Sequence, residues 1–116
     1  MSKKRRDRDF LRDVQEAMER ISLYMKGLTY PKFLEDKKTQ DAVVRNFEII
    51  GEASKNITST FKSEHPDVPW KKLAGLRDKL IHFYFGIDFK IVWNIARKEI
   101  PTLRRQVKTI FSNKSG

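Results

Sequence analysis

The sequence predicts an all-α protein, a bundle of four to five helices running up and down. Three observations support this fold class. Apolar residues recur at steps of three and four through most of the chain, which is the spacing of one buried helix face. Turn-forming residues separate these stretches at Gly27, at His65 to Trp70 and at Gly86. Cysteine is absent, which excludes disulfides and thiolate metal sites.

The first predicted helix covers about Asp7 to Lys26 and has a single apolar face. Its apolar positions are Phe10, Val14, Ala17, Ile21, Tyr24 and Leu28. Gly27 is expected to end this helix, because glycine readily adopts the left-handed conformation of a C-terminal cap. The next residues, Leu28 to Asp36, contain Pro31 and are expected to form a short loop that places aromatic side chains on the core.

The second predicted helix covers about Lys37 to Lys62, with Asp36 or Thr39 as its N-cap. Its apolar face repeats every seven residues, which is typical of helices that pack at shallow crossing angles. That face consists of Val43, Phe47, Ile50, Ser54, Ile57 and Phe61. Gly51 lies inside this helix, where glycine costs about 1 kcal/mol relative to alanine. Close approach of another helix would account for it.

Two prolines mark the connection to the third helix. The stretch from His65 to Trp70 is expected to be a linker, with His65 an exposed turn residue and Pro69 at the first helical position. The third helix is predicted from about Trp70 to Phe83, and Gly86 closes it. Its core-facing residues are Leu73, Leu76, Leu80 and Phe83.

The last third of the chain is predicted to be helical with one interruption. Asp88 is the expected cap of a fourth helix, whose apolar face of Val92, Ile95 and Ala96 continues past Pro101. Proline removes a helical hydrogen bond and clashes with the preceding turn, so a kink or break is expected near Lys98 to Pro101. By size, residues 1–116 form a single domain, and residues 1–6 and 112–116 are expected to fray.

The charge balance favours a polyanionic partner. Lysine and arginine number 25 against 15 aspartates and glutamates, which gives a formal charge of +10. No apolar run approaches the roughly 18 residues of a membrane span, and the basic start leads into no apolar signal region. We therefore expect a cytoplasmic protein without membrane contact. The two histidines, His65 and His82, lack zinc-site spacing, so neither a metal nor a cofactor is expected.

The most informative stretch runs from Leu76 to Gly86, because it contains Arg77, His82 and Tyr84 within eight positions. Arginine binds phosphate through a planar fork of donors, and histidine exchanges a proton near its reference pKa of about 6.5. This pair suits phosphodiester chemistry. The spacing alone also fits a surface arginine and a partly buried, hydrogen-bonded histidine on an amphipathic helix.

Helix geometry limits how these residues can cooperate. On a continuous helix, positions five apart diverge by about 140°, whereas positions seven apart nearly coincide. Arg77 therefore shares a stripe with Tyr84, while His82 points elsewhere. Both residues reach one phosphate more easily if His82 lies in the last turn. Alternatively, two copies of the chain meet across a twofold axis and line one cleft.

Several charged residues are candidates for supporting roles. Asp78 is placed to orient Arg77 or a ring nitrogen of His82, and it fits a solvated helix charge equally well. The carboxylate of Glu52 is a candidate for reaching the third helix, where it would act in the reaction, pair with an arginine or cap the Trp70 turn. Lys79 and the basic residues of the last third would hold flanking phosphates, although each alone also fits a solvated helix face. Those residues are Arg97, Lys98, Arg104, Arg105 and Lys108.

The arrangement Arg-x4-His-x-Tyr at Arg77, His82 and Tyr84 resembles the signature of HEPN domains, specifically the HepT-like toxin family. The resemblance extends over nearly the whole chain. Its further parts are Ala42-Val43-Val44-Arg45-Asn46, Ile49-Ile50-Gly51-Glu52-Ala53, Pro69-Trp70, Asp88 with Ile91-Val92-Trp93, and Ile100-Pro101. Asp78 stands where this family often has asparagine.

The resemblance implies a HEPN-type bundle that dimerises with both motifs facing one cleft. It also implies a metal-independent endoribonuclease toxin of a type VII-like toxin–antitoxin pair, in which His82 transfers a proton and Arg77 stabilises the charged phosphate. The implied antitoxin is a minimal nucleotidyltransferase of the MNT type that adds AMP to Tyr84. An alternative of another class is a non-catalytic helical adaptor that binds a nucleotidyltransferase or nucleic acid.

Overall fold

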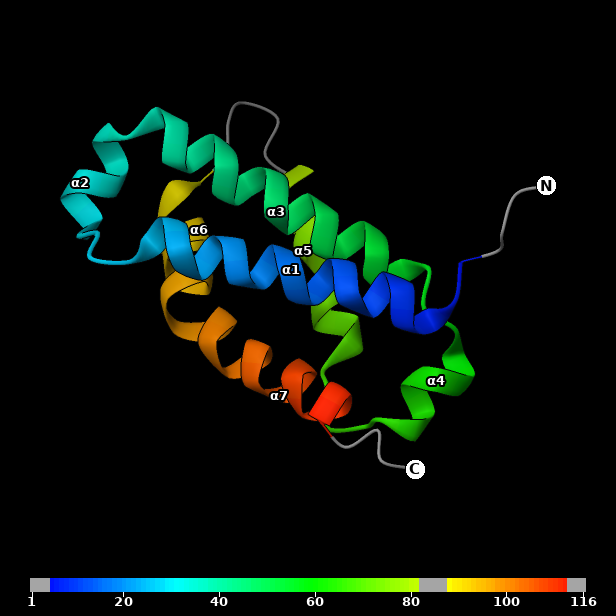
Figure 1. Ribbon diagram of the computed structural model, residues 1–116. Helices are drawn as coiled ribbons and strands as arrows, with labels where there is room; N and C mark the ends of the chain where they lie inside the picture. Colours follow the sequence, from blue (N-terminus) through cyan, green and yellow to red (C-terminus); the bar gives the residue numbers. More distant parts are fainter. Residues whose placement is uncertain (1–4, 82–87, 113–116) are drawn as a thin grey trace.

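The computed structural model describes residues 5–81 and 88–112, and this part of the chain is all-α. The longer helices are α1 (Asp7–Met25), α3 (Lys37–Lys55), α5 (Trp70–Ile81) and α7 (Ile100–Ser112). The shorter ones are α2 (Tyr30–Glu35), α4 (Ser59–Glu64) and α6 (Phe89–Asn94). Figure 1 shows α1 lying between α3 and α7, with α5 behind. The all-α bundle expected from the sequence is confirmed.

The core is built around α3, which packs against both α1 and α5, and α7 covers the side of α1 away from α3. Its fully buried side chains come from every longer helix. They include Leu11, Val14, Ile21, Val43, Phe47, Ile50, Leu73, Leu76, Ile100 and Val107. Each buried aliphatic or aromatic side chain of this kind contributes about 1.5 to 3 kcal/mol. Within the described residues, no helix is both long and apolar enough to cross a membrane.

The first helix ends as predicted. α1 spans Asp7–Met25, and Gly27 follows with a φ of +72°, a conformation that only glycine adopts without strain. Acidic residues occupy the first turn, where the helix dipole favours them. One of these, Asp9, accepts a hydrogen bond from the backbone N–H of Arg6 at 2.9 Å. The expected helix from Asp7 to Lys26 is therefore confirmed.

The expected loop from Leu28 to Asp36 is wrong, because it contains helix α2. The hydroxyl of Thr29 caps this helix by accepting from the backbone N–H of Lys32 at 3.4 Å, and Pro31 occupies its first turn. Proline fits there because no intrahelical hydrogen bond is lost. α2 places Phe33 in the core with its side chain fully buried. Asp36 then caps α3, as expected, by accepting from the backbone N–H of Thr39 at 3.0 Å.

The single helix expected from Lys37 to Lys62 is also wrong, because the chain breaks after Lys55 into α3 and α4. The hydroxyl of Thr58 caps α4 by accepting from the backbone N–H of Phe61 at 3.2 Å. Thr58 also donates from its backbone N–H and its hydroxyl to the carboxylate of Asp7, at 2.8 and 2.7 Å. Ile57 and Phe61 are buried on either side of this capped turn, so the apolar spacing continues across the break and does not reveal it.

The linker from His65 to Trp70 is confirmed. The Trp70 indole N–H donates to the His65 carbonyl at 2.9 Å, which folds the linker back on itself. The sequence predicts Pro69 at the first helical position, but α5 begins at Trp70, so Pro69 lies one residue before the helix. Its carbonyl accepts from the backbone N–H of Leu73 at 3.1 Å, the first hydrogen bond of α5. α5 is described as Trp70–Ile81. Its predicted end at Phe83 and the closing Gly86 lie outside the described residues.

The irregularity predicted around Pro101 takes the form of a π-helical turn, Ile95–Glu99, between α6 and α7. The backbone N–H of Ile100 donates to the carbonyl of Ile95, five residues earlier. The wider turn relieves the clash that a proline ring makes with the carbonyl four residues before it. Figure 1 shows that the chain changes direction here, between α6 and α7. At the start of α6, Asp88 accepts from the backbone N–H of Lys90, as the sequence predicts.

Candidate functional site

Arg77 lies on the face of α5 that packs against α3, and Gly51 makes this contact possible. A Cβ atom built on Gly51 would lie 2.8 Å from the Cβ of Arg77 and 3.1 Å from its backbone nitrogen. The first distance is shorter than real Cβ contacts and the second is unusually tight, so glycine is what lets the two helices approach this closely. The close approach expected at Gly51 is confirmed, and the residue it meets is Arg77 itself.

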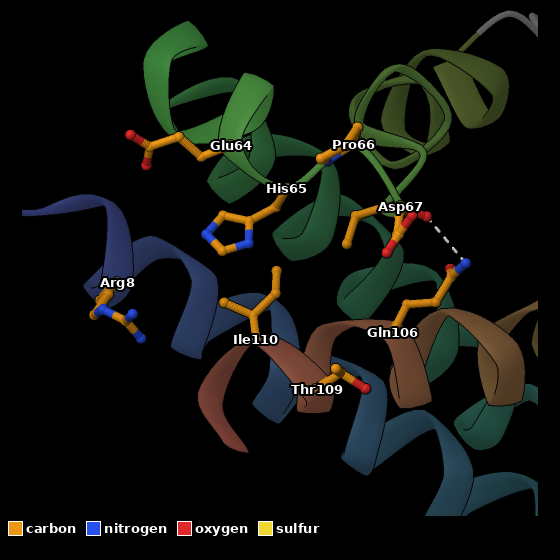
Figure 2. Close-up of a pocket in the computed structure, with 9 residues that line it drawn as sticks. Arg8, Glu64, His65, Pro66, Asp67, Gln106, Thr109 and Ile110 are labelled. Carbon is orange, nitrogen blue, oxygen red and sulfur yellow. Dashed lines mark hydrogen bonds between the residues drawn. The ribbon is translucent and has the colours of Figure 1, made fainter. Parts of the chain in front are cut away.

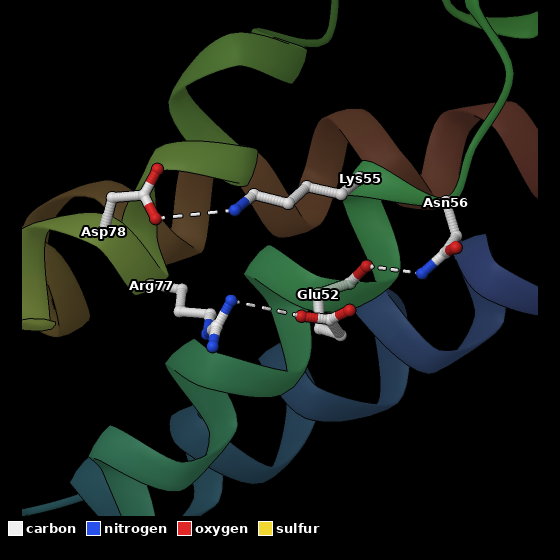
Figure 3. Close-up of polar contacts among 5 residues, drawn as sticks. All are labelled: Glu52, Lys55, Asn56, Arg77 and Asp78. Carbon is white, nitrogen blue, oxygen red and sulfur yellow. Dashed lines mark hydrogen bonds and ion pairs between the residues drawn. The ribbon is translucent and has the colours of Figure 1, made fainter.

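Two ion pairs join the same two helices (Figure 3). A guanidinium nitrogen of Arg77 lies 3.5 Å from a carboxylate oxygen of Glu52, and the ammonium group of Lys55 lies 3.4 Å from the carboxylate of Asp78. The side chains of Arg77 and Glu52 are 42% and 63% exposed. Such exposed pairs contribute at most about 1 kcal/mol each because water screens them. The guanidinium of Arg77 is therefore open to an incoming anion.

An open depression of about 320 Å³ lies beside this pair. Its lining residues are Arg45, Glu48, Ile49, Glu52 and Arg77. The two arginines would attract a phosphate, while the two glutamates would repel it and compete for the guanidinium groups. The charges of the lining side chains therefore cancel, and Arg45 and Arg77 are the cations that a phosphate would contact there.

The structure settles where Glu52 and Asp78 lie. Glu52 reaches α5 and pairs with Arg77, one of the alternatives open from the sequence. Asp78 pairs with Lys55 rather than with Arg77. The sequence reasoning missed Arg45, Glu48 and Lys55. Their spacing contained a signal, because residues 45, 48, 52 and 55 follow steps of three and four and thus share one face of α3.

His82 and Tyr84 lie outside the described residues, and so does the side chain of Lys79. α5 leads directly to His82, since Ile81 is its last described residue. The arrangement of Arg77 with His82 and Tyr84 therefore stays a prediction from the sequence.

The expectation that Arg97 binds RNA is not supported by its contacts. Its guanidinium donates to the carbonyls of Met25 and Leu28, at 2.9 and 2.5 Å, and lies 4.7 Å from the centre of the Trp93 ring. These bonds cap the C-terminal end of α1, where a cation is favourable. Arg97 is thus engaged in holding the π-helical turn against α1.

The other basic candidates of the last third differ in exposure, and Arg104 has the same intermediate burial as Arg97. Lys98 and Arg105 are exposed, and Arg104 is half-buried. The guanidinium of Arg105 also donates to the Thr102 hydroxyl at 3.2 Å. Arg104 and Arg105 belong to α7, which lies on the opposite side of α1 from α3 (Figure 1). These two residues are therefore not part of the depression beside Arg77.

A second pocket, of about 290 Å³, lies between the start of α1, the linker before α5 and the end of α7 (Figure 2). His65 lines it, and its ring faces Ile110. The expectation that His65 is an exposed turn residue is wrong, because the imidazole is half-buried and packs 4.6 Å from the Phe61 ring. A hydrogen bond of 3.0 Å from the Gln106 amide to the Asp67 carbonyl closes one wall. In the described part of the chain, no three carboxylate or imidazole side chains converge as metal ligands would.

Comparisons with known proteins agree on one family. The family model described as "Ribonuclease HepT-like" matches residues 14–110. A Thermococcus cleftensis protein named "Probable ribonuclease HepT" is 50% identical over 101 residues, which cover 87% of this chain and 92% of that protein. A Methanocaldococcus jannaschii protein named "Putative RNase" is 45% identical over 109 residues, or 94% of this chain and 90% of that protein. A Caldanaerobacter subterraneus protein, also named "Putative RNase", is 44% identical over 104 residues, or 90% and 93%. No solved structure matches the chain.

Proposed function

The chain belongs to the HepT-like ribonuclease family, and we propose that it is an endoribonuclease that cleaves RNA with Arg77 and His82 and without a metal ion. The observation that carries this proposal is the position of Arg77. Gly51 fixes its backbone against α3, while its side chain stays 42% exposed beside a depression that a second arginine, Arg45, also lines. A cation whose backbone is held in place and whose side chain a phosphate can reach is suited to stabilise the charge of a phosphorane once RNA covers the site.

The proposed reaction uses the 2′-hydroxyl of RNA as the nucleophile. A base removes its proton, the 2′-oxygen bonds to the adjacent phosphorus, and the bond from phosphorus to the 5′-oxygen breaks. The leaving 5′-oxygen takes up a proton, so the products carry a 2′,3′-cyclic phosphate and a 5′-hydroxyl. His82 performs proton transfer, which contributes about 10²- to 10⁴-fold to the rate, and Arg77 stabilises the negative charge on the phosphate.

We also propose that the working unit is a homodimer, each copy being one domain of residues 1–116. On a continuous helix, Arg77 and His82 diverge by about 140°, so one copy aims them at one phosphate only with difficulty. Two copies around a twofold axis would supply two imidazoles, one to accept the proton and one to donate it. Sedimentation of a stable monomer that still cleaves RNA would contradict this.

The proposed partner is a nucleotidyltransferase antitoxin that adds AMP to Tyr84 in the cytoplasm. Each added phosphate would bring negative charge close to Arg77 and occupy the cation that RNA needs. After co-expression with the partner, mass spectrometry should find AMP-sized additions on Tyr84. The Tyr84→Phe variant should carry none and should cleave RNA despite the partner. Additions at another residue would rule this mechanism out.

The experiment that tests the ribonuclease proposal compares variants on labelled RNA in the presence of EDTA. The wild type should release fragments that end in a 2′,3′-cyclic phosphate, whereas Arg77→Ala and His82→Ala should lose cleavage and keep their helical circular dichroism. Arg45→Gln is the matched control, because Arg45 lines the same depression. It should raise KM and leave kcat close to that of the wild type. Cleavage by a folded His82→Ala variant would refute the assignment.

A further inference from the structure

The start of α1 and the end of α7 lie side by side (Figure 1). Two arginines of α1 lie over one aromatic ring of α7. The guanidinium groups of Arg8 and Arg12 lie over the ring of Phe111, 5.9 and 5.5 Å from its centre. Arginine stems pack well on an aromatic face while their charged ends stay in water. Phe111 therefore holds two neighbouring cations in place at the surface.

The carboxylates nearby compensate these two arginines only in part. The pKa of Asp9 is lowered by the hydrogen bond from the Arg6 backbone and also by the charges of Arg5 and Arg12, and Glu64 lines one pocket with Arg8. The first two turns of α1 contain three aspartates, and each has another partner. Asp7 accepts from Thr58, Asp9 from the backbone of Arg6, and Asp13 pairs with Arg5 at 2.9 Å. Among the residues that the structure describes, no carboxylate lies within 4.0 Å of the guanidinium of Arg8 or Arg12.

The neighbouring helix adds more positive charge. α7 contains no aspartate or glutamate, and Arg104, Lys108 and Phe111 follow one another at steps of four and three. They therefore share one stripe of α7 beside α1. In the described structure, neither Arg104 nor Lys108 forms an ion pair. The α1 glutamates Glu16 and Glu19 limit the positive surface farther along the seam.

We propose that this basic seam, made of Arg8, Arg12, Arg104 and Lys108 around Phe111, binds the sugar–phosphate backbone of single-stranded RNA at a second site. The inference rests on the proposed ribonuclease function. It concerns the part of the RNA that the enzyme binds outside the site of cleavage. α1 separates the seam from α3 and its contact with Arg77, so the two sites engage different phosphates of one RNA.

The geometry favours a nucleic acid strand over a single small anion. Arg8 and Arg12 are one helical turn apart, and so are Arg104 and Lys108, which spaces each pair by about 6 Å along its helix. Two rows of cations with this repeat match a chain of regularly spaced phosphates. Neutralising several phosphates releases counterions, which makes such binding strong at low salt and weak at high salt.

The test measures binding in an Arg77→Ala background, so that RNA is not cleaved. Fluorescence anisotropy would follow a single-stranded RNA of about 16 nucleotides and a fragment of about 4 nucleotides. The double substitution Arg8→Gln with Arg12→Gln should weaken binding of the longer RNA about fivefold to tenfold. It should also reduce the slope of log Kd against log salt by about 1 to 2. The short fragment should be affected less.

Two comparisons decide whether the seam itself is responsible. Arg104→Gln with Lys108→Gln removes two charges from the other row and should weaken binding similarly. Lys32→Gln with Lys37→Gln removes two exposed charges from α2 and α3, away from the seam, and should weaken binding by at most about twofold because salt screens distant charges. An equal loss in this control would show that only net charge matters, which would overturn the proposal.

Further outcomes would also overturn it. If the seam variants bind RNA like their parent and lose affinity for polyglutamate, the surface recognises an acidic polypeptide instead. Thermal unfolding checks that both seam variants stay folded. Because binding is measured without cleavage, failure of the ribonuclease assignment would appear separately, as intact RNA in the wild-type reaction.

Discussion

Gly51 of α3 lies directly against Arg77 of α5, and the space between them is too small for a methyl group. The glycine sets the distance between two helices at the one residue proposed to stabilise the phosphate. Glu52, the next residue, pairs with the same arginine. Gly51 and Glu52 of α3 therefore determine the position of the Arg77 backbone and the ion pair that its guanidinium forms.

Gly51→Ala should lower both stability and cleavage. The added methyl group would meet the Cβ and backbone of Arg77 rather than a flexible side-chain end, so α5 must shift. Overpacking of this kind costs about 1 to 3 kcal/mol, which exceeds the roughly 1 kcal/mol gained in helix propensity. Urea unfolding and RNA cleavage by the folded variant would measure both effects.

Gly75→Ala is the matched control, since Gly75 also lies inside a helix. No atom lies within 4 Å of a Cβ built at this position. This substitution should stabilise the protein by about 1 kcal/mol through helix propensity and leave cleavage unchanged. If Gly51→Ala were as stable and active as Gly75→Ala, the close contact would have no functional importance.

Glu52→Gln should tighten RNA binding with little effect on stability. The carboxylate of Glu52 pairs with the guanidinium of Arg77 at 3.5 Å and repels phosphate. A glutamine amide has the same shape but no charge, so both effects should be weaker. We expect the Kd for RNA to fall about twofold to fivefold. It is measured with the His82→Ala substitution, which prevents cleavage and leaves Arg77 in place. The melting temperature should change little, because the pair is exposed to water, which screens its charges.

Asp78→Asn is the comparison for this variant. It removes one negative charge from the same pair of helices, but Asp78 contacts Lys55 rather than Arg77. Its effect on RNA binding should be smaller than that of Glu52→Gln. Equal effects would mean that the two carboxylates act only through the overall charge of the surface.

Much of the fold follows from the sequence because apolar spacing is a local property. The core positions of α1 and α3, such as Val14 and Phe47, were identified from their spacing and are fully buried. The break at Thr58 was missed because the carboxylate that stabilises it belongs to Asp7, 51 residues earlier in the chain. Nothing in the local pattern indicates such a contact. The α2 helix was missed although Thr29 and Pro31 form a recognisable helix start.

Only part of the candidate site could be predicted, because the sequence shows local patterns but not how two helices are aligned. Gly51 indicated a close helix contact, but the sequence could not identify Arg77 as its partner, because that depends on how α3 and α5 are aligned. Glu52 was a candidate, and its pairing with Arg77 follows from the same alignment. Arg97 resembled a solvated cation in sequence, and only the position of the α1 end shows that it caps backbone carbonyls.

Asp36 should contribute stability that is lost in acid. Hydrogen bonds from the Thr39 hydroxyl and backbone N–H lower the pKa of Asp36 below its ordinary value of 3.8. A lowered pKa in the folded state means that the contribution is fully present above the unfolded pKa and disappears as the pH falls through the folded pKa. Asp36→Asn should keep the cap and show a smaller drop in melting temperature below about pH 4.

Asp41→Asn provides the control for this pH dependence, since Asp41 is an exposed aspartate of the same helix. Its melting temperature should fall in acid as that of the wild type does. If the Asp36→Asn variant showed the full wild-type drop, the hydrogen bonds at the start of α3 would not be the source of the acid sensitivity.

Arg97 and Arg104 should respond to substitution in opposite ways, although both are basic residues of the last third. Arg97 donates to the carbonyl of Met25, the last residue of α1, and to that of Leu28 in the following turn, and it lies on the Trp93 ring. Arg97→Gln should therefore lower the free energy of unfolding by about 1.5 to 3 kcal/mol. The affinity of the folded protein for RNA should stay close to that of the wild type. Arg104→Gln should leave stability within about 0.5 kcal/mol and weaken RNA binding, because its charge belongs to the basic seam. Urea unfolding and anisotropy measured on both variants would separate these roles. A large loss of RNA affinity in folded Arg97→Gln, with none in Arg104→Gln, would reverse the assignment and return Arg97 to the RNA-binding surface.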